Sequence, residues 1–427
     1  MSVEPDVTGP APLGAEMPEG VRFVGAVHGS PRWPVPADAP SASDLAACVA
    51  CGLCLPHCPT YRLTGEEPAS PRGRIAAMRS VADGIADVDR TFSRFMDLCL
   101  ACRACEDVCP SHVPFGRMVE RARVQVEPLR TRRARFLRWL GLDVVLPRPA
   151  LLWIVAALQP LGRLVLPRRV RSLVPRRSEL FGRLPRLTEP AGEVRGTAAL
   201  LAGCVQDRWF REANRATIRV LARAGWRVVV PKGQRCCGAL AAHNGRLDIA
   251  RDLAERNLRA FEGVDLVVVN AAGCGAHLKD LGELLGTERA RTFSAKVRDV
   301  TEALDELGEL GPLSARVAYH DACHALRAQH IREQPRALLE RIPGLELVEI
   351  AEGDVCCGAA GLYNVLEPAM ASELRRRKAE AIVTTGASVV ASANPGCTAQ
   401  IAAGLRELGA EVEVVHPVEL LDRAART

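Results

Sequence analysis

The sequence predicts a multidomain protein in which a small helical, cysteine-rich domain precedes two tandem α/β domains. The chain has 427 residues, which corresponds to about three domains at roughly 150 residues each. Its sixteen cysteines fall into dense groups, and its last half repeats a pattern of apolar runs separated by helical sequence. With 48% hydrophobic and 25% charged residues, the composition is that of a globular protein rather than a disordered or fibrous one.

Changes in composition divide the chain into five segments. Residues 1–40, rich in Pro, Gly and Ala, are expected to form an extended arm. Residues 41–120 hold two cysteine clusters among short helical patterns. Residues 121–196 form an arginine-rich helical linker, in which repeated prolines permit only short helices. The first and second α/β domains are expected at residues 197–310 and 311–427.

Basic residues are concentrated in the linker. Residues 121–190 contain sixteen arginines, no lysine and four acidic residues, whereas the net charge of the whole chain is only +6. This confinement argues against a nucleic-acid partner. The apolar stretches 136–142 and 151–158 among these arginines suit an anionic membrane face or a docked partner. Solvated arginines over a packed linker are the alternative.

Two runs in the helical domain carry cysteines in the pattern C-x2-C-x2-C-x3-C-P. Bacterial-type ferredoxins use this pattern to bind two [4Fe–4S] clusters, and the fourth cysteine of each run ligates the other cluster. Three thiolates at intervals of three residues can surround three corners of a cubane, whereas the proline ends the loop and directs the fourth thiolate away. The spacing therefore assigns cluster I to Cys48, Cys51, Cys54 and Cys109, and cluster II to Cys99, Cys102, Cys105 and Cys58.

The forty residues between the two runs favour an α-helical ferredoxin-like domain over a compact one that contains β structure. Zinc is the alternative occupant, but zinc sites usually show two C-x2-C pairs with a longer spacer. We expect His57 and His112 to be hydrogen-bond donors or surface residues rather than ligands. Arg72 and Arg74 either place positive charge near a cluster or belong to a turn that enters the next helix.

The α/β region consists of two halves with the same order of features. In each half a CCG triplet follows the second of three apolar runs, and single cysteines end the first and third runs. Strands that alternate with helices predict parallel α/β units, and the repetition indicates an internal duplication. The runs lie at 197–204, 226–230 and 265–274 in the first half, and at 315–323, 345–350 and 388–397 in the second.

We expect the four cysteines of each half to converge. Ligand sites of open α/β sheets lie at the carboxyl ends of the strands, and a CCG glycine lets the backbone turn so that both neighbouring cysteines serve one site. The occupant is an iron–sulfur cluster, a zinc ion or a reactive dithiol, with buried free cysteines as the alternative. His320, Asp321 and His324 are expected to support the second site rather than ligate a metal. The two sets are Cys204, Cys236, Cys237 and Cys274, and Cys323, Cys356, Cys357 and Cys397.

Together these features resemble the iron–sulfur subunit of glycolate oxidase (glycolate dehydrogenase). The order of the two ferredoxin-type runs, the arginine-rich linker and the two CCG modules is similar to that family's over roughly residues 41–420. The CCG modules also resemble the cysteine-rich domain of heterodisulfide reductases and lactate-utilisation proteins. Similar local strings are PRGRI (71–75), GCGAHLK (273–279), CCGAAGLY (356–363) and NPGC (394–397).

One departure from the cysteine-rich domain concerns its end. That domain often ends in C-x-x-C, whereas here Cys274 is followed by His277 and Cys397 by Gln400. This difference argues against a five-cysteine, non-cubane cluster. Each half keeps four cysteines, enough for one metal centre.

The resemblance implies an electron-transfer subunit that works beside FAD-containing subunits, which oxidise glycolate to glyoxylate. It implies two [4Fe–4S] clusters, an acceptor other than NAD or oxygen, with quinone expected, and no catalytic residue on this chain. In agreement, no G-x-G-x-x-G follows a predicted strand. The sequence begins without a basic cluster and apolar run, so we expect a cytoplasmic protein, peripheral on the inner face of the membrane if the linker binds it.

Three alternatives remain open from the sequence. The corresponding subunit of a lactate or glycerol 3-phosphate dehydrogenase has a similar architecture. A thiol–disulfide reductase would use the CCG sites directly, and a zinc-stapled scaffold would use the cysteines for stability alone.

Overall fold

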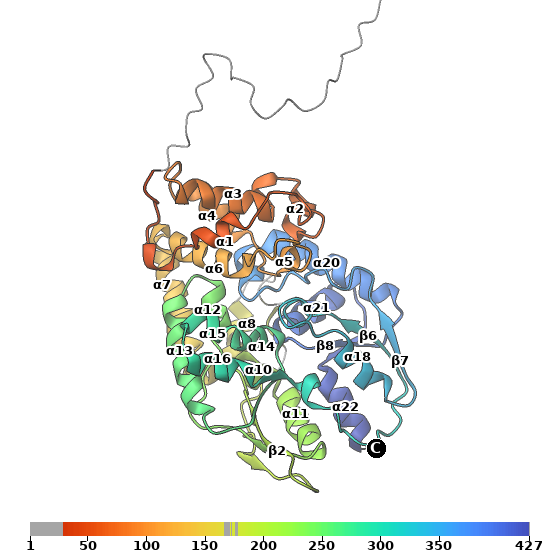
Figure 1. Ribbon diagram of the computed structural model, residues 1–427. Helices are drawn as coiled ribbons and strands as arrows, with labels where there is room; N and C mark the ends of the chain where they lie inside the picture. Colours follow the sequence, from red (N-terminus) through yellow and green to blue (C-terminus); the bar gives the residue numbers. More distant parts are fainter. Residues whose placement is uncertain (1–28, 166–170, 172, 176–177, 427) are drawn as a thin grey trace, which may run out of the picture.

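The computed structural model describes residues 29–165, 171, 173–175 and 178–426. Figure 1 shows the N-terminal helices as a cap on one end of two α/β units that lie side by side. The first part of the expected N-terminal arm, residues 1–28, lies outside the described residues. The rest of the arm covers the cap, where Trp33 packs edge-on against Phe92 at a centroid distance of 6.2 Å.

The front domain, as we call the cap, is built from short helices because the cysteine loops interrupt them. Helix α3 (Pro71–Ala82) begins with typical start signals. The Ser70 side chain accepts a hydrogen bond from the Gly73 amide, and Pro71 occupies the first helical position. The core between the helices contains Met78, Met96 and Met118, all fully buried. The helices are α1 (Ala42–Ala46), α2 (Pro59–Thr64), α3 (Pro71–Ala82), α4 (Arg90–Asp97), α5 (Ala104–Asp107) and α6 (Phe115–Val126), with 3-10 turns at Pro36–Asp38, Glu67–Ala69 and Glu127–Leu129.

The prediction that the prolines of the linker permit only short helices is wrong. Helix α8 (Pro149–Val165) runs for 17 residues and passes through Pro160. Proline lacks the amide hydrogen that would bond to the carbonyl four residues earlier, here that of Ala156. The Ser178 hydroxyl donates to this carbonyl at 3.1 Å, so the helix continues. Helix α7 (Arg132–Arg138) and the π-helical segment η4 (Trp139–Val145) precede α8.

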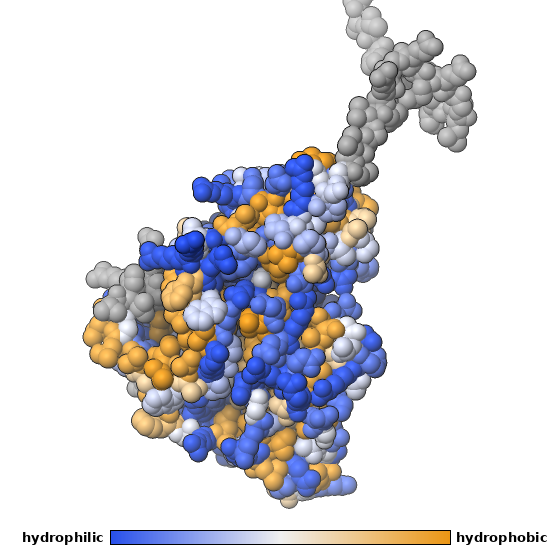
Figure 2. Space-filling model, turned by 90° about the vertical axis from the view of Figure 1, so that its left-hand side faces the viewer, coloured by the Kyte–Doolittle hydropathy of each residue, from blue (hydrophilic) through white to orange (hydrophobic). Residues whose placement is uncertain are grey.

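The linker exposes apolar side chains. Figure 2 shows hydrophobic residues gathered on one side of the molecule. Within the described part of the chain, no single helix is long and apolar enough to span a membrane, although the segments Arg132–Val145 and Pro149–Leu164 pass that test together with a bend of 111° between them. Large apolar side chains between Arg132 and Leu164 that are at least 40% exposed are Phe136, Leu137, Trp139, Trp153, Ile154, Val155, Leu158, Leu161 and Leu164.

The first α/β unit contains a five-stranded sheet in the order β1-β3-β2-β4-β5. Strands β2 to β5 are parallel, and the short β1, which comes from the end of the linker, pairs antiparallel with β3. The three apolar runs of this half form β2, β3 and β4. The strands are β1 (Leu187–Thr188), β2 (Gly196–Leu200), β3 (Trp226–Val229), β4 (Leu266–Val269) and β5 (Val297–Asp299); the helices are α10 (Val205–Trp209), α11 (Arg211–Arg223), α12 (Ala239–His243), α13 (Leu247–Ala260), α14 (Ala272–Lys279), α15 (Leu281–Leu285) and α16 (Glu288–Ala295), followed by the turn η5 (Val300–Ala303).

The second unit repeats this arrangement with a fully parallel sheet in the order β7-β6-β8-β9. Its strands β6, β7 and β8 again correspond to the three apolar runs. The strands are β6 (Ala315–His320), β7 (Leu345–Glu349), β8 (Val389–Ser392) and β9 (Glu413–Val415); the helices are α17 (Cys323–Leu326), α18 (Glu333–Glu340), α19 (Tyr363–Leu366), α20 (Pro368–Thr384), α21 (Pro395–Glu407) and α22 (Pro417–Arg426).

The two α/β units share one apolar core. Helix α11 of the first unit packs against α22 of the second, and η5 packs against α18. Helices α11 and α18 follow equivalent strands of the two units, and η5 and α22 follow the last strand of each unit. The two contacts are therefore equivalent, each joining the first part of one unit to the end of the other. The strand ends also meet, because the Ala272 amide donates to the Ala393 carbonyl at 3.0 Å. The carboxyl edges of the two sheets therefore lie next to each other.

Candidate metal centres

The front domain brings its eight cysteines into two groups, each of which mixes the two runs. One cavity is lined by three cysteines of the first run and by the last cysteine of the second, together with Cys105, which also lines the other cavity. The other is lined by three cysteines of the second run and by the last of the first. We name these groups site I (Cys48, Cys51, Cys54 and Cys109) and site II (Cys99, Cys102, Cys105 and Cys58).

The loops of sites I and II share an unusual backbone. Ala50 and Gly52 of the first run have positive φ angles of 55° and 86°, and Ala101 and Arg103 of the second run have 50° and 62° at the same two positions. Left-handed residues at such spacing turn amide groups toward the inside of a loop. The Ala101 amide accordingly donates to the Cys99 thiol at 3.3 Å. The loops are shaped to surround an anionic, sulfur-rich group.

Two arginines that sequence reasoning missed hold the loops in place. Arg79 of α3 donates to the carbonyls of Leu45 and Cys48. Arg123 of α6 donates to the Cys99 carbonyl. The same guanidinium also donates to the carbonyls of Met96 and Asp97 at the end of α4. Each arginine thus ties the first cysteine of a run to the helix that precedes it. The one sequence signal for this role is that the two cysteine runs are equivalent, so that each is expected to have an arginine in the helix packed against it.

Arg72 and Arg74 combine the two roles expected for them. Both lie in the first turn of α3, and each contacts one site. Arg72 donates to the Ala50 carbonyl in the loop of site I at 3.3 Å and pairs with Glu67. Arg74 is 1% exposed, and its Nη1 lies 4.0 Å from the Cys58 sulfur of site II.

The two front sites differ in their distance from solvent. Cys51 of site I is exposed, and the neighbouring Val49 and Leu53 are 69% and 56% exposed. Three cysteines of site II are buried, and burial is the main reason that the pKa of Cys102 is raised to about 12. His57 and His112 are both exposed, as expected for surface residues.

The first α/β unit brings its four cysteines together at the carboxyl edge of the sheet. We name this group site III. The thiols of Cys204 and Cys236 are 3.4 Å apart, and those of Cys237 and Cys274 are 3.1 Å apart. Gly238 has φ +100°, and a Cβ there would meet the ring of His277, so the turn after the CCG triplet requires glycine.

The second unit forms the equivalent site IV. Its thiols are in contact in the order Cys323, Cys356, Cys357, Cys397. Gly358 has φ +84°, and a Cβ there would lie 2.8 Å from the Ala371 carbonyl oxygen. All four cysteines of each expected set thus converge in both units.

The residues around Cys323 have separate roles. Asp321 is buried and forms a two-point ion pair with Arg336 at 2.8 and 2.9 Å. The His324 ring is in hydrogen-bond contact with the Ala101 carbonyl of the site II loop at 2.9 Å. His320 ends strand β6 with its ring buried near the thiols.

Site IV also contacts the front domain directly. The Tyr363 hydroxyl donates to the Leu98 carbonyl, next to the site II loop, at 3.1 Å. Together with the His324 contact, this bond fixes the second unit against site II. No comparable contact runs from site III to site I among the described residues.

Most cysteines of sites III and IV have raised thiol pKa values. Contact with Cys356, followed by burial, raises the pKa of Cys323 well above its usual value. Contact with Cys236 and burial do the same for Cys204. A metal ion binds such thiols as thiolates and releases their protons. The four convergent thiols of each unit form a donor set that suits a thiophilic metal centre.

A polar cavity, not foreseen from the sequence, lies between the front domain and the first α/β unit. His243 Nδ1 and Glu120 Oε1 are 2.6 Å apart there, and the rings of His243 and His324 stack edge-on at 5.1 Å. His277 lines the same cavity, and burial lowers its pKa to about 4. The cavity places titratable groups beside the site II loop.

Comparisons with known proteins agree with this arrangement. A family model described as a 4Fe-4S dicluster domain matches residues 44–113, and one described as a cysteine-rich domain matches residues 198–279 and 317–402. One chain of the fumarate reductase (CoM/CoB) from Methanothermobacter marburgensis is 30% identical and aligns with 91% of this chain and 74% of its own length.

Two further relatives align over nearly their whole length. The probable glycolate oxidase iron–sulfur subunit of Bacillus subtilis is 37% identical over 419 residues, which cover 90% of this chain and 94% of the relative. The glycolate oxidase iron–sulfur subunit of Escherichia coli is 32% identical with the same coverage. The chain belongs to the family of glycolate oxidase iron–sulfur subunits.

Proposed function

We propose that this chain is the electron-transfer subunit of a flavin-linked glycolate dehydrogenase, which oxidises glycolate to glyoxylate. The observation that carries the proposal is the exchange of cysteines between sites I and II, in a chain whose relatives are glycolate oxidase iron–sulfur subunits. Sharing of the fourth ligand between two runs is the arrangement of two-cluster ferredoxins.

Sites I and II would each hold one [4Fe–4S] cluster, which supplies one-electron transfer when bound. The chain's own residues provide what such clusters need. Inward amides such as that of Ala101 stabilise sulfur charge, and Arg74 places a buried positive charge beside site II. Buried apolar residues around site II, Leu100 and Ala104 among them, exclude water.

Site I is the proposed side of contact with an FAD-containing partner. Its ligand Cys51 is exposed, and Val49 and Leu53 form an apolar surface around it. Partner interfaces are commonly apolar at their centre and rimmed by charge; Arg72, which touches the site I loop, supplies such a charge. The carbon chemistry takes place on the partner, so this chain is not catalytic alone.

The proposed acceptor is a quinone, which the linker brings within reach by resting on the membrane. Exposed apolar side chains on α8 lie close in sequence to the exposed Arg132, Arg133 and Arg135 of α7. Such amphipathic surfaces bind the interface of anionic membranes, and each surface arginine contributes about 1 kcal/mol.

The membrane role has a direct test in vesicle flotation at low salt. Replacement of Arg132, Arg133 and Arg135 by Gln is expected to weaken binding to phosphatidylglycerol vesicles roughly 100-fold. The matched control replaces three exposed arginines of the first α/β unit and keeps the binding; they are Arg256, Arg289 and Arg291. Equal binding by both triple variants removes the membrane role.

The function itself is tested with anaerobically purified chain and its FAD-containing partner. Glycolate is expected to bleach the visible iron–sulfur absorption only when the partner is present, and L-lactate and glycerol 3-phosphate should act much more slowly. Faster bleaching by either of these substrates would transfer the proposal to that dehydrogenase. Disulfide reduction by the chain alone would favour a thiol–disulfide reductase, and a colourless zinc protein without acid-labile sulfide would favour a scaffold.

A further inference from the structure

His320 occupies a position that no interaction with the rest of the described chain explains. It is the last residue of β6, it is 1% exposed, and neither ring nitrogen has a hydrogen-bond partner among the described residues. A buried polar group without a partner costs about 1–3 kcal/mol. Two unpartnered nitrogens on one ring therefore indicate that something else binds there.

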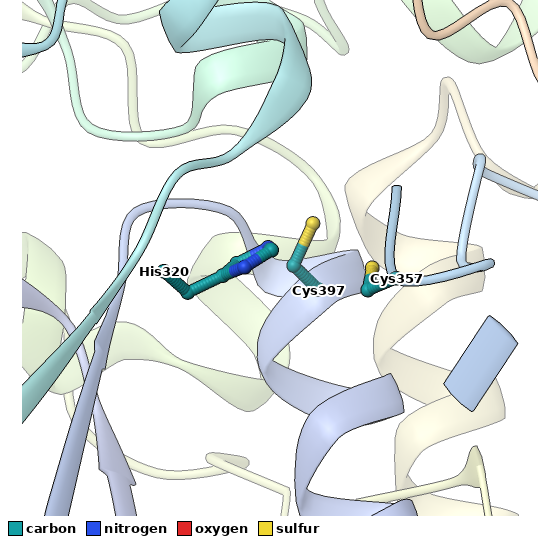
Figure 3. Close-up of side chains that lie close together, drawn as sticks. All are labelled: His320, Cys357 and Cys397. Carbon is teal, nitrogen blue, oxygen red and sulfur yellow. The ribbon is translucent and has the colours of Figure 1, made fainter. Parts of the chain in front are cut away.

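The ring faces two thiols of site IV. One nitrogen of His320, Cys357 Sγ and Cys397 Sγ all lie within 4.8 Å of one another. Figure 3 shows the ring pointing toward Cys397, with Cys357 beside it. No other group of three such donor residues lies this close together in the described part of the chain.

The spacing favours a single ion over a cluster. With zinc–sulfur bonds of about 2.3 Å and zinc–nitrogen bonds of about 2.0 Å, the donors of a tetrahedral site lie about 3.6 Å apart. Donors that are all within 4.8 Å of one another can therefore close on one ion with small side-chain movements. The thiolates of a cubane bind different iron corners and must lie farther apart.

The duplicated fold supplies an internal comparison. His320 lies three residues before Cys323, and Leu201 lies three residues before Cys204 in the first unit. Leu201 is 1% exposed and packs in an apolar cluster with Cys236 and Cys237. The fold thus accepts an apolar residue at this position, so histidine is not needed for packing there.

The charges around site IV suit thiolate ligands. Lys378 is 4% exposed and donates to the carbonyls of Glu352 and Gly353. Its positive charge acts on the sulfurs of Cys357 and Cys397, and Arg327 acts in the same way on Cys323. Asn394 donates to the Cys397 sulfur at 3.3 Å, as expected for a supported thiolate ligand.

We propose that His320, Cys357 and Cys397 bind a single divalent ion of the zinc class in the second α/β unit. The three side chains supply one imidazole and two thiolate donors, a set that zinc prefers, and leave the fourth tetrahedral position open. The proposal concerns site IV alone and does not depend on the clusters proposed for sites I and II.

The test measures metal content and coordination in the full chain, purified without oxygen. We expect about one zinc per chain and a zinc X-ray absorption spectrum with nitrogen as well as sulfur in the first shell. His320→Ala should lose more than half of the zinc, and His320→Cys should retain zinc with sulfur ligands only. His416→Asn is the matched control, because His416 is also a buried histidine of this unit but lies outside the donor group.

Two results would overturn the proposal. One is a His320→Ala protein that keeps its zinc and the nitrogen scattering. The other is a wild-type protein without zinc whose His320→Ala variant loses about four irons, because site IV would then hold an iron–sulfur cluster. The electron paramagnetic resonance signals of sites I and II report separately on the relay, so failure of one proposal is distinguishable from failure of the other.

Discussion

Cys102 of site II and Cys356 of site IV lie in one buried apolar cluster that joins the front domain to the second α/β unit. Burial, followed by the neighbouring Cys323 thiol, raises the pKa of Cys102, so charges in the two sites act on each other. Sites III and IV are equivalent by duplication, yet only site IV has this relation to a front site among the described residues.

This asymmetry predicts that site II senses changes in site IV. Cys356→Asp places a negative charge beside site II and is expected to lower the reduction potential of the site II cluster by roughly 50–100 mV. The equivalent change in site III, Cys236→Asp, should leave that potential unchanged. Potentiometric titration monitored by electron paramagnetic resonance distinguishes the variants; equal shifts in both would contradict the relation.

The exchange of cysteines between the front sites gives a second prediction. Cys109→Ser should disturb the site I cluster although Cys109 belongs to the second run, and Cys58→Ser should disturb the site II cluster. A cubane that loses one thiolate ligand converts or falls apart, with a loss of about one to four irons. Iron analysis and spectra of the two reduced variants, compared with each other, test the assignment. If each variant affects the cluster of its own run, the exchange is wrong.

The parts of the structure that could be predicted from sequence are those that local spacing encodes. Cysteine intervals and the positions of the two prolines indicate the grouping of sites I and II, because a loop of fixed length reaches only certain corners. The apolar runs predict six of the parallel strands, because strands in sheets covered by helices are rich in apolar residues; β4 and β8 are the most deeply buried of them. Strands β5 and β9 are only three residues long, so they leave no comparable run.

Features that depend on contacts between distant residues could not be predicted in this way. Arg79 and Arg123 act on carbonyls 24 to 34 residues away, and their sequence surroundings are those of ordinary helical arginines. His320 was expected to support site IV, but a lone histidine before a cysteine does not reveal that its nitrogens lack partners. The unbroken α8 likewise depends on Ser178, which lies 22 residues beyond Ala156.

Arg74 is predicted to set the potential of site II. Replacement by Met removes a buried positive charge beside Cys58 and is expected to lower the site II potential by roughly 100 mV. Arg74→Lys keeps the charge and should recover most of the difference. Arg72→Met is the control for site I, where a smaller shift is expected because Arg72 is paired with Glu67 and partly exposed. A site II potential that is equal in the Met and Lys variants would show that charge is not the cause.

The Ser178 hydroxyl is predicted to stabilise α8 only because position 160 is proline. Ser178→Ala leaves the buried Ala156 carbonyl without a donor and should lower the free energy of unfolding by about 1–2 kcal/mol. In a Pro160→Ala background the restored amide can donate to the same carbonyl, so the serine change should cost much less. Denaturation of the four proteins in urea gives the coupling energy. Additive effects of the two changes would remove this account of the helix.

His416 is predicted to make the second α/β unit less stable in acid. Burial lowers its pKa to about 4 in the folded chain, below the ordinary value of about 6.5. The unfolded chain therefore binds more protons between these values, and stability is lost as the pH falls through them.

Between pH 7 and pH 5 the expected loss is about 2 kcal/mol. His416→Asn keeps an acceptor for the Val418 amide, which donates to the imidazole Nδ1 in the native chain, but it cannot titrate. The difference in unfolding free energy between pH 7 and pH 5 should therefore be smaller in this variant by that amount, and acid effects on the metal sites cancel in the comparison. An identical pH dependence in both proteins would contradict this prediction, because it would mean that the His416 ring is already protonated in the folded chain at pH 5.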